Sequence, residues 1–165
     1  MTRFLNLILL ISISFCSYGQ NEAQLSDYIK MTETDSLYLI AIQKYTAEIK
    51  TFFRKNPERK KPKIIYIQNE NYLRLITNQI NGFEIQKIGI ANRKKVFREN
   101  KNKLELVKVS PLTIENGQFK IGLIPYLAEL KSKKRLNLSL SVWTNVYFNY
   151  VDGKLIYAET KNGGI

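Results

Sequence analysis

Histidine is absent from the 165-residue chain, and cysteine occurs once, at Cys16. These absences exclude Ser-His-Asp and Cys-His catalytic arrangements, zinc sites built on histidine or several cysteines, and haem ligation by histidine. The sequence also has no glycine-rich phosphate loop, dinucleotide-binding fingerprint or calcium-binding loop. Its 14 acidic residues are dispersed, and no two of them stand out as a catalytic pair. We therefore predict no catalytic residue, no metal site and no cofactor.

The first 19 residues predict a signal peptide. Arg3 is followed by an apolar stretch that ends at Phe15 and is shorter than the ~20 residues that a membrane-spanning helix needs. Ser17 and Gly19 are small residues in the positions that signal peptidase favours. Cleavage after Gly19 would release a cysteine-free protein to the periplasm or the medium. In the alternative reading Cys16 is acylated and begins a lipoprotein, which the bulky Phe15 before it disfavours.

After the signal peptide the sequence predicts a flexible lead-in over residues 20–33 and a single α+β domain over residues 34–165. Apolar residues recur every three or four positions between Leu37 and Phe53, which predicts an amphipathic helix over residues 34–55. The helix must end before Pro57, because the residue preceding a proline disfavours helical geometry. Short strands are expected over residues 63–68 and 83–90.

The second half predicts four strands, over residues 103–114, 118–130, 136–150 and 154–160. Asn116-Gly117 and Asp152-Gly153 are signals for two-residue hairpin turns, whose central residues need positive φ. Such turns would place Ile114 opposite Phe119, Tyr150 opposite Leu155 and Phe148 opposite Tyr157. The third of these strands alternates apolar and polar residues, so its apolar members are expected on one face, under the helix: Leu136, Leu138, Leu140, Val142, Val146 and Phe148.

This order of elements predicts an α+β fold in which the N-terminal helix packs on a curved, mainly antiparallel sheet with a meander in its second half. The arrangement is similar to cystatin-like and NTF2-like folds, an analogy that carries no function. A signal ending in Gly-Gln, the early helix, Ser110-Pro111-Leu112 leading into Asn116-Gly117, the long alternating strands and the tail 162–165 together resemble small exported proteins of unknown function of the flavobacterial (Bacteroidetes) type. The resemblance implies an envelope or secreted location and no catalytic residue.

Two sets of residues are candidates for binding. Trp143 and Tyr147 share the polar face of their strand with Asn145, and Lys120 is expected nearby, so these side chains could form an aromatic platform for a sugar or a partner's side chain. Alternatively, residues 63–90 pack over this face and bury it. The second set consists of basic loops within a chain of net charge +12, and it includes Arg93, Lys94, Lys95, Lys133, Lys134 and Arg135.

The basic clusters are expected on helix ends and loops, where charge is commonly just solvated. Aromatic residues are not interleaved among them, which disfavours nucleic acid as a partner. The sequence favours a non-catalytic domain that binds a protein or an envelope component, one form of which is an immunity-type inhibitor. The alternatives are an enzyme that uses Asp, Glu, Tyr or Lys in a pocket between helix and sheet, and a binder of polyanions such as lipopolysaccharide phosphates.

Overall fold

A computed structural model of the protein describes residues 30–132, 135–140 and 142–164. The chain divides into two compact units, Met1–Thr32 and Glu33–Ile165, and the described helices and strands all lie in the second. The expected signal peptide, Cys16 and the lead-in up to residue 29 lie outside the described residues, as do Lys133 and Lys134. No helix in the described ranges is both long enough and apolar enough to span a bilayer.

The helix expected over residues 34–55 is present as α3 (Glu33–Lys55). Its first turn carries Glu33 and Asp35 and its last turn carries Arg54 and Lys55, so the charges at both ends oppose the helix dipole. The Asn56 side chain donates a hydrogen bond to the Phe52 carbonyl at 2.8 Å, and the helix stops there, before Pro57.

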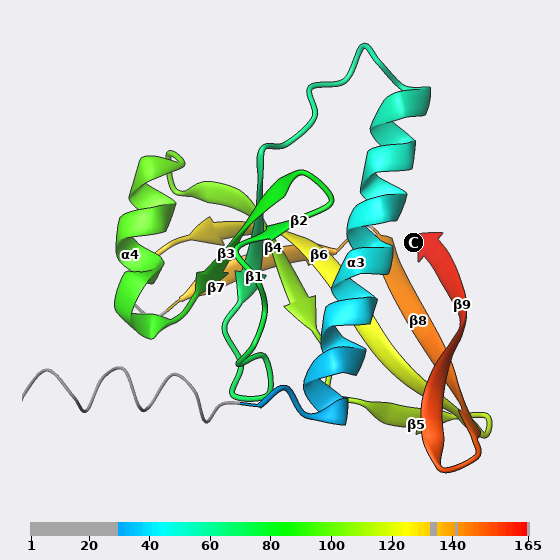
Figure 1. Ribbon diagram of the computed structural model, residues 1–165. Helices are drawn as coiled ribbons and strands as arrows, with labels where there is room; N and C mark the ends of the chain where they lie inside the picture. Colours follow the sequence, from blue (N-terminus) through cyan, green and yellow to red (C-terminus); the bar gives the residue numbers. More distant parts are fainter. Residues whose placement is uncertain (1–29, 133–134, 141, 165) are drawn as a thin grey trace, which may run out of the picture. The chain divides into compact units, whose positions relative to one another are not determined.

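A mixed, mostly antiparallel sheet forms the rest of the unit and is built, among the described residues, from nine strands (Figure 1). Its main order is β2-β3-β1-β4-β6-β8-β9, with β5 and β7 pairing along β6. The strands are β1 (Ile64–Gln68), β2 (Gln79–Ile80), β3 (Phe83–Ile88), β4 (Lys103–Val109), β5 (Thr113–Glu115), β6 (Gln118–Leu130), β7 (Leu136–Leu140), β8 (Val142–Val151) and β9 (Lys154–Gly164). The α+β class and the predominance of antiparallel pairs are therefore confirmed.

The first half of the sheet differs from the expectation in two ways. Strand β1 pairs in parallel with both β3 and β4, so the strands within residues 63–90 extend the sheet, and Leu73 and Ile76 between them pack in the core with α3. A helix that the sequence analysis missed, α4 (Ile90–Glu99), connects β3 to β4. The strands β3 and β4 are parallel and lie on either side of β1, so they need such a crossover, because a tight turn can join only antiparallel strands. Arg93, Lys94 and Lys95 lie on this helix and not on a loop, which corrects the prediction for them.

Both predicted hairpins of the second half are confirmed. Ile114 pairs with Phe119, Tyr150 with Leu155 and Phe148 with Tyr157, as the two turn signals require. The turn residues Asn116, Gly117, Asp152 and Gly153 all have positive φ, between 48° and 80°. Strand β6 has the predicted bounds, whereas the expected strand 103–114 is divided into β4 and β5.

The predicted single strand 136–150 is wrong. It is divided into β7 and β8, and the pairing with β6 changes register between them. Two residues of β6 separate Leu123 from Tyr126, whereas three residues separate their partners Thr144 and Leu140. One extra residue moves the side chains of one strand to the opposite face relative to the other strand. The apolar residues of 136–148 therefore do not share a face.

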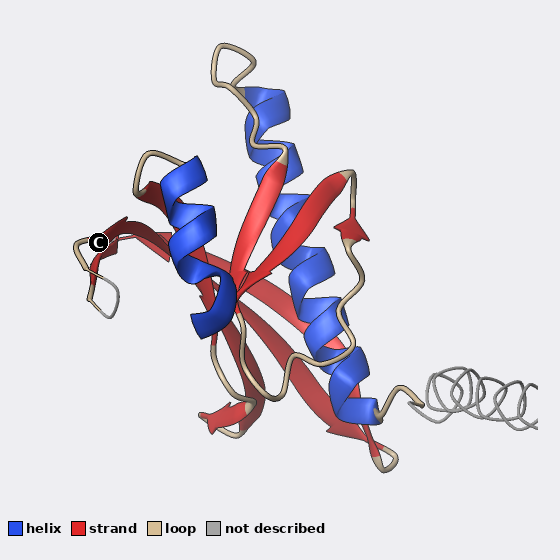
Figure 2. Cartoon of the chain, turned by 90° about the vertical axis from the view of Figure 1, so that its left-hand side faces the viewer, coloured by secondary structure: helices blue, strands red, loops and turns tan. Residues whose placement is uncertain are grey.

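Each face of the sheet accordingly has its own apolar core, with strands lying between the two helices (Figure 2). On one face α3 packs on the sheet, where Val146 and Phe148 of β8 are fully buried beneath it. On the other face the α4 residues Val96 and Phe97 cover a smaller core, against which Leu136 and Leu138 of β7 pack.

Candidate functional site

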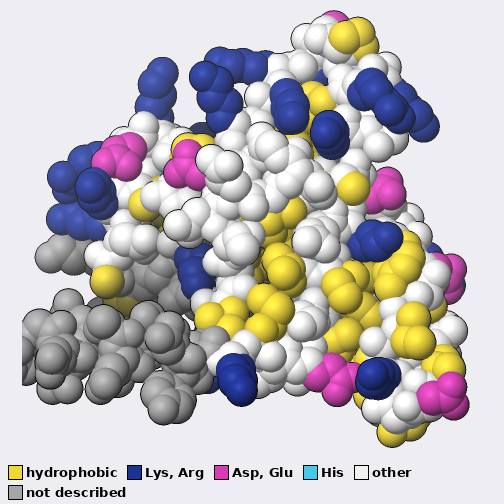
Figure 3. Space-filling model, in the orientation of Figure 1, with side chains coloured by type: hydrophobic (Ala, Val, Ile, Leu, Met, Phe, Trp, Pro, Cys, Tyr) yellow, Lys and Arg dark blue, Asp and Glu magenta, His cyan; other side chains and the backbone are white. Residues whose placement is uncertain are grey.

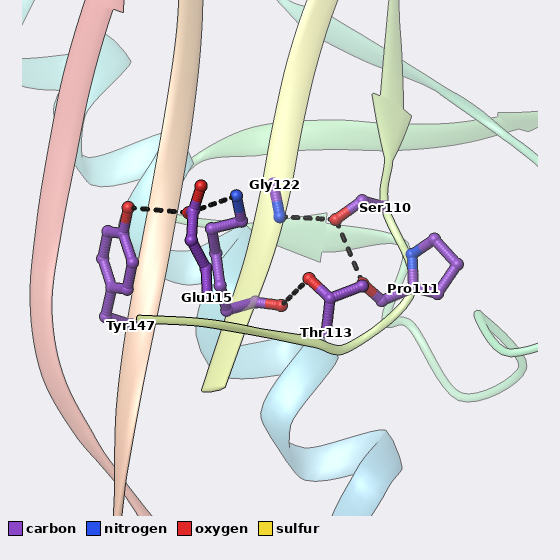
Figure 4. A network of polar contacts seen from close by, with 7 residues as sticks. Ser110, Pro111, Thr113, Glu115, Gly122 and Tyr147 are labelled. Carbon is purple, nitrogen blue, oxygen red and sulfur yellow. Dashed lines mark hydrogen bonds and ion pairs between the residues drawn. The ribbon is translucent and has the colours of Figure 1, made fainter. Parts of the chain in front are cut away.

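The face of the sheet that carries Tyr147 holds a closed polar network rather than an open platform (Figure 4). Tyr147 lies directly opposite Lys120, and both hydrogen-bond to Oε2 of Glu115, at 3.4 and 2.5 Å. The hydrogen bond from Lys120 lowers the pKa of Glu115. The ammonium of Lys161 lies 5.0 Å from the centre of the Tyr147 ring. A ligand stacking on Tyr147 would thus compete with contacts that the domain already makes.

Trp143 and Asn145 lie further along β8, at the positions that the sequence predicts. Asn145 pairs with Gly122, and its side-chain oxygen lies over that glycine. A Cβ atom at position 122 would lie 3.2 Å from this oxygen. Trp143 pairs with Gly163 on the edge strand, and its half-buried indole occupies the space that a side chain at Gly163 would need. The four candidate residues share one stretch of β6 and β8, but the Trp143 ring packs on the sheet edge instead of joining Tyr147.

The basic residues gather in two places on the face shown in Figure 3, over α4 and at the end of α3. Lys94 and Arg98 of α4 lie beside Lys131, which follows β6, and these three side chains line one small pocket of about 240 Å³. The fold thereby joins two clusters that are far apart in the sequence. Arg135 is exposed in the turn after β6, and Arg93 is half-buried on α4.

A groove of about 870 Å³ lies between the second half of α3 and the sheet and is called here the α3 groove. One wall is α3 and the loop that follows it, and the other is formed by β1, β4, β8 and the end of β9. Its lining consists of Tyr45, Glu48, Ile49, Phe52, Phe53, Arg59, Lys60, Pro62, Ile64, Ile65, Tyr66, Asn100, Leu104, Glu105, Val107, Pro125, Val142, Trp143, Thr144, Asn162 and Gly163.

The groove exists because the apolar stripe of α3 continues beyond the core that covers it. In the first half of the helix, Leu37 and Ile42 have exposed fractions of 3% and 0%. The same spacing continues through Ile49 and Phe52, but Ile49 is only half-buried and Phe52 is 44% exposed. An amphipathic helix normally buries its whole apolar face. The last turns of α3 therefore present an apolar surface that nothing in the described part of the domain fills.

Two exposed acidic residues, Glu48 and Glu105, line this groove. Glu105 of β4 is accessible from the groove, and desolvation raises the pKa of its carboxyl group because the charged form loses hydration. Burial, and secondarily the charge of Glu105, raise the pKa of the Tyr45 hydroxyl well above its ordinary value. The Tyr45 hydroxyl is a hydrogen-bond donor at neutral pH, as in an ordinary tyrosine, and the raised pKa further disfavours its ionisation.

The rim of the groove is polar and has a cationic end. On the β8–β9 side Thr144 donates a hydrogen bond to Asn162 at 2.8 Å, and Asn162 donates to Glu48 of α3 at 3.3 Å. At the end of α3 the guanidinium of Arg59 lies 5.4 Å from the centre of the Phe52 ring, and Lys60 follows it on the same wall. The exposed end of the groove thus combines an aromatic ring with two basic side chains, one of which, Arg59, also contacts Glu58 at 3.9 Å.

No known protein family, curated protein or solved structure matches this chain. The sequence analysis anticipated Trp143 as a candidate but missed Glu105 and Phe52. Glu105 is one acid in an ordinary strand pattern, and only the fold places it in a cavity. A sequence signal for Phe52 was present, because the apolar repeat of the helix extends to this residue, beyond the turns that the core covers.

Proposed function

We propose that the protein is an exported, non-catalytic binding domain whose site is the α3 groove, and that the ligand is an anionic amphiphile with an apolar body and one negatively charged head. The observation that carries the proposal is the uncovered apolar end of α3, which faces the sheet across a groove with a volume of about 870 Å³. Small-molecule sites are clefts of about 300 to 1,000 Å³ with mainly apolar walls and a few placed polar groups. The groove has this size and composition.

The charge of the rim supports an anionic head group. Arg59 and Lys60 stand at the open end of the groove, and Arg59 is already positioned beside the Phe52 ring. A negative head placed there would remain partly hydrated while its apolar body lies along Ile49 and Phe52. The interior favours neutral groups, since desolvation raises the pKa values of both Tyr45 and Glu105.

A second candidate is an enzyme, and the observation that favours it is Glu105. A carboxyl group with a raised pKa in a cleft is the kind of group that acts as a general acid. Retaining and inverting glycosidases, however, need two carboxylates about 5 to 10 Å apart. The other carboxylate of the groove, Glu48, is on the rim and accepts a hydrogen bond from Asn162. A binding function accounts for the apolar walls, the polar rim and the raised pKa of Glu105 without a second catalytic carboxylate, so we prefer it to an enzyme.

The test measures ligand binding through the intrinsic fluorescence of Trp143, the chain's one tryptophan, which lines the groove. Three ligands with the same ten-carbon tail are compared: decanoate, decanol and decyltrimethylammonium. We expect saturable binding of decanoate, weaker binding of decanol and the weakest binding of the cation. Equal binding of the cation and the anion would contradict the assignment of the head group, and no saturable binding of any of the three would refute the proposed site.

Matched variants locate the binding. Phe52→Ser should weaken decanoate binding roughly tenfold, because about 1 to 2 kcal/mol of apolar contact is lost. Ile156→Ser removes an apolar side chain of similar exposure, 52% against 44%, outside the groove, and should change nothing. Replacing Arg59 and Lys60 by Ser should weaken decanoate more than decanol, whereas the same double change at Lys95 and Lys154 should not. Equal effects of the two double changes would mean that net charge alone drives binding.

A further inference from the structure

A second site lies away from the groove, where α4 meets the turn that follows β6. Its pocket of about 240 Å³ is lined by Lys94, Arg98, Asn102, Leu130, Lys131 and Ser132. Three of these six residues are cationic, and the side chains of Asn102 and Ser132 offer hydrogen-bonding groups. The main chain fixes the two halves of the pocket together, because the Leu130 amide donates a hydrogen bond to the Asn102 carbonyl at 2.9 Å.

The positive charge of this pocket is poorly balanced by the protein. Lys94 and Arg98 are four residues apart on α4, a spacing at which like charges destabilise a helix. Neither forms an ion pair with any described residue. Lys131 contacts Glu129 at 2.9 Å, but that carboxylate also contacts Lys103 at 3.7 Å. The carboxylate of Glu129 is thus shared by two lysines, and the positive charges of Lys94 and Arg98 are not neutralised by an ion pair among the described residues.

The turn between α4 and β4 also departs from ordinary backbone geometry. Lys101 and Asn102 have φ values of 55° and 63°, in the left-handed region that costs free energy for residues other than glycine. The Asn102 amide nevertheless donates to the Phe97 carbonyl at 2.7 Å, which holds the turn closed. This geometry brings Asn102 to the pocket beside Arg98.

We infer that this pocket binds the dianionic phosphate group of a phosphomonoester. A planar guanidinium can donate two parallel hydrogen bonds to phosphate oxygens, and lysines contribute point charges around it. Arg98 takes the first role, and Lys94 and Lys131 take the second from opposite sides of the pocket. The hydroxyl of Ser132 is placed to donate a further hydrogen bond. Bound phosphate also removes the repulsion between Lys94 and Arg98, so binding stabilises α4.

The experiment titrates the ¹⁵N-labelled exported chain with inorganic phosphate at constant ionic strength and pH 7.5. We expect saturable shifts of the amide signals of Asn102, Ser132 and Arg98. Arg98→Ser should raise the dissociation constant at least fivefold. The matched control is Lys95→Ser, which removes one positive charge from the same helix but does not line the pocket, and it should leave the constant unchanged. If Lys95→Ser weakens binding as much as Arg98→Ser, the interaction is general electrostatics and the inference fails.

A second arm distinguishes the source of the phosphate group. Phosphatidylcholine vesicles with and without phosphatidate are sedimented with the protein, again for the original chain, Arg98→Ser and Lys95→Ser. Sedimentation that needs both phosphatidate and Arg98 assigns the group to a lipid head. Binding of inorganic phosphate without such sedimentation assigns the group to a soluble phosphate compound rather than to a lipid head. If neither arm shows binding that depends on Arg98, the inference is overturned, and because the groove assay uses unphosphorylated ligands, that result leaves the proposed function standing.

Discussion

The register change between β7 and β8 predicts that Leu140→Asp and Val146→Asp have very different effects on stability. Leu140 and Val146 are six residues apart, so an uninterrupted strand would place them on the same face with the same role. In the structure Val146 is 0% exposed beneath α3, whereas Leu140 is 38% exposed. A carboxylate at position 146 would be enclosed by apolar groups, and one at position 140 would reach water.

The expected difference is several kcal/mol. Val146→Asp loses about 1.5 to 3 kcal/mol of apolar burial and leaves an unpaired charge in the core, which costs several kcal/mol more. The sum approaches the whole stability of a small domain, about 5 to 15 kcal/mol. Leu140→Asp loses only the buried part of one side chain, about 1 to 2 kcal/mol, and no charge is desolvated.

Urea denaturation followed by tryptophan fluorescence measures this difference. If Val146→Asp fails to fold, Val146→Thr and Leu140→Thr form a milder pair. Val146→Thr keeps the volume and buries one hydroxyl, at a cost of about 1 to 3 kcal/mol, whereas Leu140→Thr should cost less. Equal changes in the free energy of unfolding within each pair would mean that Leu140 and Val146 share one face, and the argument from register would be refuted.

Three further predictions concern single side chains. The pKa of Glu105 is raised in the folded protein, so above pH 4.5 the native state binds more protons than the unfolded state and loses stability as the pH rises. Glu105→Gln should therefore become more stable than the original chain between pH 4.5 and 7 and should match it at pH 3. Melting curves that show no such trend would contradict this prediction. Gly163→Ala should displace the Trp143 indole, since a Cβ would lie 2.2 Å from the ring, and a tryptophan emission spectrum identical to that of the original chain would count against the packing described. Asn81 and Asn116 both have positive φ in Asn-Gly turns, but of the two only Asn81 donates hydrogen bonds to α3, at 2.8 and 2.9 Å. Asn81→Ala should therefore lower the free energy of unfolding by about 1 to 2 kcal/mol more than Asn116→Ala does. Equal losses in urea denaturation would show that these hydrogen bonds contribute nothing to stability.

The sequence was sufficient where a local rule fixes the geometry. The helix over Glu33–Lys55 follows from the spacing of its apolar residues and from Pro57 beyond its end. The two hairpin registers follow from Asn-Gly and Asp-Gly, because those dipeptides tolerate the positive φ that a two-residue turn demands.

Helix α4 escaped the sequence analysis because its apolar signal is small. Among its ten residues only Val96 and Phe97 are buried, and four of the others are lysine or arginine. A sequence of this composition is equally typical of a solvated loop. Its start is instead fixed by Asn92, which accepts a hydrogen bond from the Gly89 amide and donates one to the Lys87 carbonyl, both at 2.8 Å. The parallel pairing of β1 also depends on contacts between segments that no local pattern predicts.

The division of strand 136–150 is the failure that bears on the site. Its alternation continues unchanged through the break, so the period of two gives no sign that the pairing with β6 shifts by one residue. Pro125 of β6 lies within the interval where the shift occurs, and a proline has no N–H to offer a neighbouring strand. A proline inside a strand that otherwise is central to a sheet is the one signal that could have indicated an irregularity.

The same register change links the fold to the α3 groove. Because β7 turns its leucines toward the α4 core, the α3 face above it lacks the apolar side chains that an uninterrupted strand would have supplied there. The groove lies at this place, and Val142, Thr144 and Pro125, which flank the shift, are among its lining residues. Bulges in sheets commonly occur beside functional sites, where they redirect side chains. Deleting Ser141 would leave two residues on each strand between the pairings Leu123–Thr144 and Tyr126–Leu140, so both pairings with β6 would continue without a shift and the β7 leucines would still face α4. We therefore expect the variant to keep the core around Phe97 closed and to bind no more of a hydrophobic dye than the original chain does. Increased dye binding would show that the leucines had changed face, which would contradict the register described.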